Sequence, residues 1–122
     1  MDRRARWTNA LVAAALAGGA TLPAMANPED IEKARQLLNQ SNPKQAYMEL
    51  IKHEARLAGN IDYDYLLGVA SLDSGKIDDA IVAFERVLAL NANHAGAQMD
   101  LARAYFAAGS FDLAEASFKQ LA

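Results

Sequence analysis

Few side chains in this chain of 122 residues could do chemistry, and their spacing does not bring them together. The two histidines, His53 and His94, lie 41 residues apart, and the sequence contains no cysteine. A metal site needs three or four converging ligands, so we predict no metal site. We expect His94 to begin a helix and His53 to lie near a helix end, where the helix dipole favours a cation.

Two pairs of carboxylates, Asp62 with Asp64 and Asp78 with Asp79, are the other candidates. A hydrolase can use such a pair across a substrate cleft. Both pairs instead occur at expected helix starts, where acids cap the helix and complement its dipole. No serine lies in a nucleophile motif, and no glycine-rich loop of the phosphate-binding type precedes a helix. We therefore predict that the chain is not an enzyme, with no catalytic residue and no cofactor.

The elements that would position these side chains are all predicted to be helices. Apolar residues recur at helical spacing after residue 27, and no segment alternates apolar with polar residues. Asparagine followed by proline, at 27–28 and again at 42–43, indicates two helix starts. Further helices are expected at about 62–74, 78–90, 95–108 and from 112 onward, with the second helix extending to about Ala55. Gly75 and Gly109 are expected to end helices in the left-handed conformation, and the short connections predict antiparallel pairs.

Two stretches of the chain repeat each other at an offset of 34 residues. A fixed period of this length is typical of stacked helical units, each of which buries its apolar face against its neighbour. We expect Gly68 to face Ala80 across one hairpin and Ala102 to face Ala114 across the next, because small residues let two helices approach closely. The phenylalanines of the repeat are expected to fill the gap toward the neighbouring unit. The recurring pairs include Gly68 and Ala102, Ala80 and Ala114, and Phe84 and Phe118.

Specific motifs accompany this period. One copy contains YLLGVA at 65–70, GKIDDAI at 75–81 and FERVLALN at 84–91; a second contains LARAY at 101–105, GSFDLA at 109–114 and Phe118. These motifs closely resemble the tetratricopeptide repeat. The resemblance implies an all-α fold, an α-solenoid of antiparallel helix pairs that forms a superhelix of about three repeats. The implied helical repeat domain spans 27–122, with a degenerate repeat at 27–60, a repeat at 61–94 and an incomplete repeat at 95–122.

The chain departs from the family pattern at four positions. Asp64 and Gln98 stand where the family often has tryptophan, Ser71 stands where tyrosine is usual, and Ala92 replaces the usual proline between repeats. The missing proline predicts a looser junction between the second and third repeats.

The resemblance also implies a binding face. In the family, the first helix of each pair lines a concave wall, and such proteins bind other proteins. We therefore expect a non-enzymatic interaction scaffold or adaptor that binds a partner peptide or helix, with Tyr65, Arg103 and Phe106 as anchors. Some wall residues, Leu72 and Phe106 above all, are alternatively inter-repeat core. The expected partner-binding residues are Arg35, Tyr65, Val69, Asp73, Met99, Arg103 and Phe106, with Ile31, Leu38, Leu72 and Ala107 beside them.

Residues 1–26 are typical of a signal peptide. A basic start at 2–6 precedes an alanine-rich apolar run, and Ala24-Met25-Ala26 supplies the small residues of a cleavage site. The alternative is an ordinary helix at the start of a cytosolic protein. Removal of residues 1–26 changes the net charge from −3 to −5, which argues against a nucleic-acid partner and against an anionic membrane surface. A cysteine-free domain behind such a signal suggests the periplasm of a Gram-negative cell, with no membrane insertion by 27–122.

The chain ends before a third full repeat, which would continue about six residues beyond Ala122. Three interpretations stay open: a fragment of a longer product, which we favour; an interface for self-association through the uncapped C-terminal face; or a frayed end. A second functional hypothesis follows from the first interpretation. The chain would then be the soluble N-terminal region of a larger outer-membrane or envelope assembly or export protein, and outer-membrane-associated if a membrane domain follows.

Overall fold

The computed structural model describes residues 28–121, and within that range it contains helices and no strand. The predicted signal peptide, 1–26, lies outside the described residues. The all-α fold class is thereby confirmed. The helices are α2 (Pro28–Asn39), α3 (Pro43–Ile51), α4 (Glu54–Leu57), α5 (Ile61–Asp73), α6 (Ile77–Leu90), α7 (Ala95–Ala107) and α8 (Phe111–Leu121).

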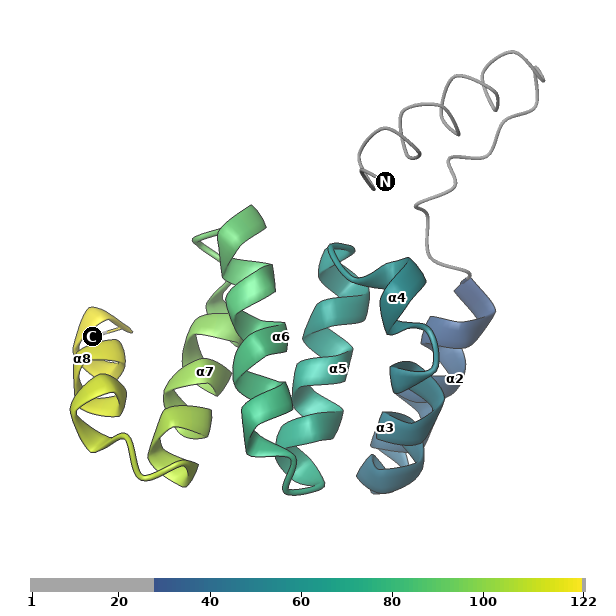
Figure 1. The fold of residues 1–122 in the computed structure, drawn as a ribbon, viewed down its shortest axis with the longest axis horizontal. Coiled ribbons are helices and arrows are strands. Elements are labelled where there is room, and N and C mark those ends of the chain that lie inside the picture. Colours follow the sequence, from purple (N-terminus) through teal and green to yellow (C-terminus); the bar gives the residue numbers. More distant parts are fainter. Residues whose placement is uncertain (1–27, 122) are drawn as a thin grey trace, which may run out of the picture.

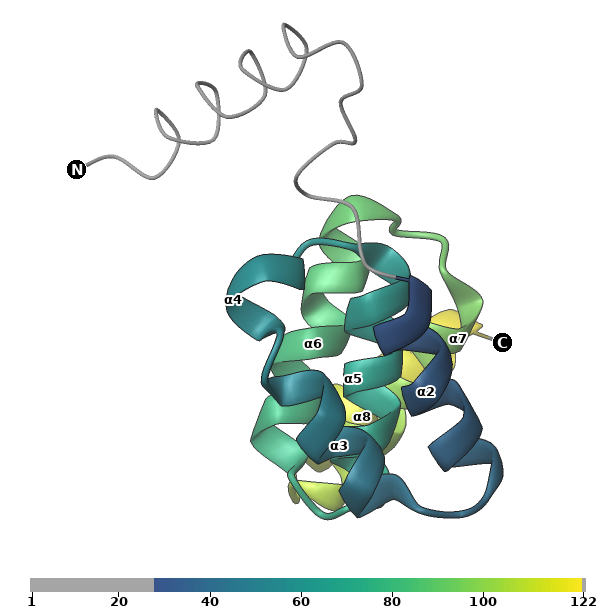
Figure 2. The ribbon, with the colours of Figure 1, turned by 90° about the vertical axis from the view of Figure 1, so that its right-hand side faces the viewer.

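The helices form consecutive hairpins that stack side by side into an elongated array (Figure 1). Within the hairpins, α2 packs on α3, α5 on α6 and α7 on α8; between hairpins, α3 packs on α5 and α6 on α7. The first helices also contact one another, α2 with α5 and α5 with α7. Seen along the array, α2 and α7 lie on one side and α4 and α6 on the other (Figure 2). This arrangement is the predicted helical-repeat solenoid.

The hairpin turns repeat with the same period as the sequence. Gly75 and Gly109 have φ angles of 83° and 81°, as the helix-stop prediction required, and Ser41 takes a φ of 60° at the equivalent position of the first hairpin. The residue after each of these donates its N–H back across the last helical turn, which is the usual hydrogen bond at a left-handed helix end. These bonds join Asn42 to Leu37 at 2.8 Å, Lys76 to Ser71 at 2.7 Å and Ser110 to Tyr105 at 2.9 Å.

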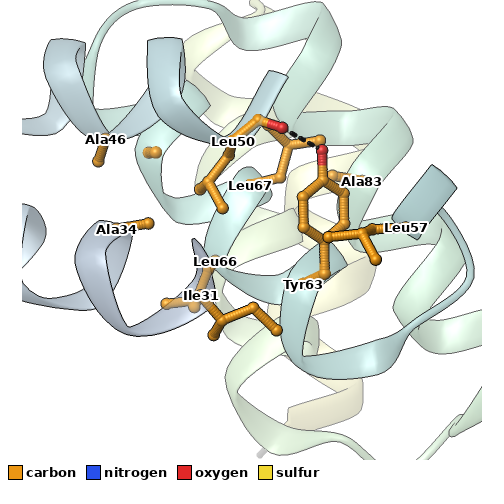
Figure 3. Close-up of a cluster of buried hydrophobic side chains, with 10 residues drawn as sticks. Ile31, Ala34, Ala46, Leu50, Leu57, Tyr63, Leu66, Leu67 and Ala83 are labelled. Carbon is orange, nitrogen blue, oxygen red and sulfur yellow. Dashed lines mark hydrogen bonds between the residues drawn. The ribbon is translucent and has the colours of Figure 1, made fainter. Parts of the chain in front are cut away.

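The predicted second helix is interrupted, which corrects its expected end near Ala55. Helix α3 stops at Ile51, and His53, two residues beyond that end, is the N-cap residue of the short helix α4. The physical reason lies in the packing of the next hairpin. The carbonyl of Leu50 accepts the Tyr63 hydroxyl at 2.5 Å and the His53 N–H at 3.0 Å, and the turn brings Leu57 into the core (Figure 3).

Two apolar clusters hold the hairpins together. The first joins α2, α3, α4 and α5, with Ala83 of α6, around Ile31, Leu50 and Tyr63 (Figure 3). In the second cluster, Phe84 of α6 is fully buried and packs with Ala97, Leu101 and Ala104 of α7. This is the position expected for a side chain that fills the gap toward the next unit. The Phe84 ring also occupies the space beside Gly68, where an added Cβ would lie 2.6 Å from its Cδ1. The small residue in α5 therefore makes room for an aromatic ring.

A buried carboxylate ties α4, α5 and α6 together. Asp64 is fully buried and accepts the Gly59 N–H at 2.8 Å and the Arg86 Nε–H at 3.0 Å, while Arg86 Nη1 donates to Glu54 at 3.1 Å. Burial opposes the charge of Arg86, but the hydrogen bonds and charges of Asp64 and Glu54 outweigh it and raise the pKa of the guanidinium. At this position the tetratricopeptide repeat often has tryptophan. The chain thus buries an ion pair there instead of an apolar side chain.

Candidate functional site

The first helices α2, α5 and α7 make a continuous face, here called the A-helix face, that carries the predicted binding residues. Tyr65 and Val69 are half-buried on α5, whereas Asp73 is exposed at the end of that helix. Met99, Arg103 and Phe106 are exposed along α7. Of the predicted residues on α5 and α7, those on α7 are therefore the more accessible to solvent.

Tyr65 lies at the junction between two hairpins. Its hydroxyl donates to Asp100 at 2.8 Å, and its ring centroid lies 4.8 Å from that of His94 and 5.9 Å from that of Phe84. Gly96 leaves space for the ring, since a Cβ there would fall 2.8 Å from the hydroxyl oxygen. Burial, together with the hydrogen bond to Asp100, raises the pKa of Tyr65 to about 12. The tyrosine is thus a half-buried contact between α5 and α7.

Asp100 connects Tyr65 to Arg103 and was missed by the sequence reasoning. Its other oxygen accepts Arg103 Nη1 at 2.8 Å, so a polar row of Tyr65, Asp100 and Arg103 crosses from α5 to α7. The Asp100 side chain is 13% exposed and that of Arg103 is 54% exposed. The spacing of Asp100 and Arg103, three residues apart on one helix, was the signal available in the sequence. The row fixes the position of one end of the guanidinium and leaves the rest accessible.

The other predicted residues occupy different surroundings. Arg35 is exposed on α2 and pairs with Glu32 at 3.5 Å. Val69 packs against the second apolar cluster, as Leu72 does. Phe106 is 61% exposed, and its ring meets the ring of Phe111 edge-on at a centroid distance of 5.2 Å. Of the neighbouring wall residues, Ile31 is buried, Leu38 is half-buried and Ala107 is exposed.

Phe106 belongs to a second surface, the groove between α7 and α8 at the end of the array. This C-terminal groove is open to solvent and has a volume of about 460 Å³. Exposed phenylalanines dominate it, because no further helix covers α8 among the described residues. Leu121 lines a separate small hollow with Leu88 and Leu101. The lining residues of the C-terminal groove are Phe106, Phe111, Ala114, Glu115, Phe118 and Lys119.

The titratable residues considered for chemistry all lie at helix starts. His94 is the N-cap of α7, as predicted, and its Nδ1 accepts the Ala97 N–H at 3.0 Å. His53 lies 3.7 Å from Asp30. Asp62 with Asp64, and Asp78 with Asp79, lie in the first turns of α5 and α6, as predicted. Over residues 28–121, no group of three or more histidine or acidic side chains is arranged to hold a metal ion.

Between residues 28 and 121, every helix is too short or too polar to cross a bilayer.

Residues 71–122 match the model of the tetratricopeptide repeat family. No curated protein and no solved structure matches the chain. The matched range contains α6, α7 and α8 with the end of α5, so it includes Arg103 and the whole C-terminal groove. The match supports the interpretation of the chain as a tetratricopeptide repeat protein, a class that generally mediates protein–protein interaction and is generally non-enzymatic.

Proposed function

We propose that the chain is a non-enzymatic interaction scaffold that binds a peptide or helix of a partner protein along the A-helix face. The observation that carries the proposal is the polar row of Tyr65, Asp100 and Arg103, which fixes an exposed guanidinium on that face at the junction of two hairpins. Arginine held in place by a neighbour loses less conformational entropy when it binds, and it is frequent among the residues that dominate interfaces.

The surroundings of Arg103 indicate the chemistry of the partner. Met99 lies one turn before it on α7 and Phe106 one turn after it, and their exposed fractions are 45% and 61%. A basic group between two apolar side chains suits a segment that has an acidic residue flanked by apolar ones. We propose that such a segment docks along α7 and extends over Tyr65, Val69 and Asp73 of α5 toward Arg35 of α2.

A crosslinking experiment tests this placement. A photoreactive amino acid at Met99 is expected to crosslink the partner in cell-envelope extracts, and Arg103→Glu should reduce the product about tenfold, because it reverses the charge that meets the acidic residue. The matched control is the same amino acid at Val82, which is 49% exposed on α6, in the second-helix layer. Equal yields from the two positions, or no effect of Arg103→Glu, would contradict binding on the A-helix face.

We propose further that this scaffold works in the cell envelope. The support is the signal-like pattern of residues 1–26. The exported part would be a domain at 27–122, made of three repeat units that divide near residues 60 and 94. Periplasmic location, or attachment to the outer membrane as part of a larger envelope assembly or export protein, follows from export. Sequencing the N-terminus of the protein recovered from a periplasmic fraction should give Asn27 as the first residue; an intact Met1 in the cytosolic fraction would refute export.

A further inference from the structure

Helix α7 begins with a different capping residue from α5, the helix that takes its place in the preceding repeat. Asn60 is the N-cap of α5, and its side-chain oxygen accepts the Tyr63 N–H at 3.0 Å. His94 stands at the same position of the repeat, 34 residues later, and its Nδ1 accepts the Ala97 N–H at 3.0 Å. The two side chains therefore make the same capping hydrogen bond with different chemical groups.

The two caps differ in their response to protons. The carboxamide of Asn60 does not titrate, so its oxygen remains an acceptor at acidic pH. An imidazole ordinarily gains a proton at about pH 6.5, and both ring nitrogens of an imidazolium are donors. Because Nδ1 of His94 faces the N–H of Ala97, this hydrogen bond exists only while Nδ1 carries no proton. Protonation of His94 therefore removes the cap of α7 and leaves the cap of α5 intact.

The surroundings of His94 do not replace the lost hydrogen bond. The first turns of α5 and α6 each contain two aspartates, whereas residues 95–98, the first turn of α7, contain no acid, so an imidazolium there meets the positive end of the helix dipole. From α5, the ring of Tyr65 faces the imidazole, and its hydroxyl donates to Asp100 of α7. An aromatic ring attracts a cation, but this contact leaves the N–H of Ala97 without its acceptor.

His94 also supports the polar row of the A-helix face. Its ring centroid lies 4.8 Å from that of Tyr65, the Tyr65 hydroxyl donates to Asp100 at 2.8 Å, and Asp100 holds Arg103 at 2.8 Å. We propose that His94 is a positioning residue at the junction of α5 and α7, and that its protonation loosens this junction at mildly acidic pH. The consequence for binding rests on the proposed function, because Arg103 is the proposed contact with the partner.

Amide hydrogen exchange, followed by NMR on the purified chain, tests the cap without any partner. Expressed as a protection factor, which corrects for the intrinsic effect of pH, the protection of the Ala97 N–H should fall about fivefold between about pH 7.5 and 5.5, as expected for the loss of an N-cap. The Tyr63 N–H, capped by Asn60, is the control within the same molecule and should keep its protection factor. Equal changes at the two amides, or no change at Ala97, would overturn the proposal.

Two variants assign the effect to one histidine. His94→Asn gives α7 the cap that α5 has, so the protection of Ala97 should become independent of pH over this range. His53→Asn is the matched control, because it removes the other histidine of the chain, which lies 3.7 Å from Asp30 and 3.3 Å from Arg56. It should leave the pH dependence at Ala97 as in the wild type. A pH dependence that survives His94→Asn, or that disappears in His53→Asn, would refute the role of His94.

The crosslinking experiment at Met99, repeated at the two pH values, tests the consequence for binding. The yield of the wild type should fall about fivefold at the lower pH, whereas His94→Asn should give equal yields, because its cap is retained. Equal yields from the wild type would show that the cap does not position the A-helix face. Absence of a crosslink at both pH values would contradict the proposed function instead, and the exchange of Ala97 would still decide whether the junction responds to protons.

Discussion

At Ser41 the backbone takes a conformation that glycine takes at both equivalent turns. Its φ of 60° places it beside Gly75 and Gly109 in the left-handed region, one and two periods before them in the sequence. A residue with a Cβ pays about 1–2 kcal/mol for this conformation, whereas glycine does not. The turn forms nevertheless, because the Asn42 N–H makes the same hydrogen bond as in the other hairpins. The contacts of the stack therefore impose a turn that the local sequence does not favour.

We predict that Ser41→Gly stabilises the protein by about 0.5–1 kcal/mol, since the relief of strain exceeds the entropy that glycine adds to the unfolded chain. Thermal unfolding followed by circular dichroism should show the midpoint rise by about 4 °C. Gln40→Gly, at the exposed neighbour that does not have a positive φ, should lower it. A lower midpoint for Ser41→Gly would show that this turn is not strained.

At the scale of the elements, the ion pairs of one arginine link the short helix α4 to α5 and α6. Arg86 of α6 reaches Asp64 of α5 and Glu54 of α4, which are 22 and 32 residues away in the sequence. The Nη2 atom of Arg86 also lies 2.8 Å from the same Asp64 oxygen, although without hydrogen-bond geometry. Asp64 has no exposed surface, so the arginine is what compensates its charge.

We predict that Arg86→Met destabilises the protein by about 3 kcal/mol, because it leaves the Asp64 carboxylate buried without a cation. The double variant Asp64→Leu/Arg86→Met should recover more than half of that loss, since no buried charge then remains. Urea unfolding of the single and double variants measures both effects.

The control for this pair is Arg56→Met, which removes a 46% exposed arginine paired with Asp30 and should cost less than about 1 kcal/mol. If Arg86→Met is no worse than Arg56→Met, the pair contributes as little as a surface ion pair.

At the scale of the whole molecule, hydroxyl groups bridge the stacked units. Tyr47 donates to Asp79 at 2.7 Å and Tyr65 to Asp100 at 2.8 Å, each from one hairpin to the next. The hydrogen bond to Asp79 and partial burial raise the pKa of Tyr47 to about 12, which matches Tyr65. Burial also raises the pKa of Tyr63 and, with the Glu85 hydrogen bond, that of Tyr105. These are the four tyrosines of the chain.

Alkaline pH should therefore loosen the stack. A tyrosine whose folded pKa is raised contributes stability that is fully present below its unfolded pKa of about 10 and is lost as the pH rises through the folded value near 12. We predict a fall in the free energy of unfolding between about pH 10 and 12, measured by urea unfolding, with tyrosinate absorbance delayed until the protein unfolds. Tyr65→Phe should flatten the fall. Tyrosines that titrate near pH 10 in the folded protein would contradict the inter-unit hydrogen bonds.

The sequence by itself showed the period of 34 residues directly, and it determined the helices and the helix-ending glycines because each depends on contacts or backbone preferences within about one turn of the chain. Only the tertiary structure decided the break at Lys52–His53, the burial of Asp64 under Arg86 and the bond from Tyr65 to Asp100, 35 residues away. It also showed that Phe106, one turn beyond Arg103 on α7, lines the C-terminal groove as well. The physical reason is that a repeat predicts which helices meet, whereas side-chain pairing depends on the rotation and offset of one helix against the next. Those quantities follow from the packing of the whole stack.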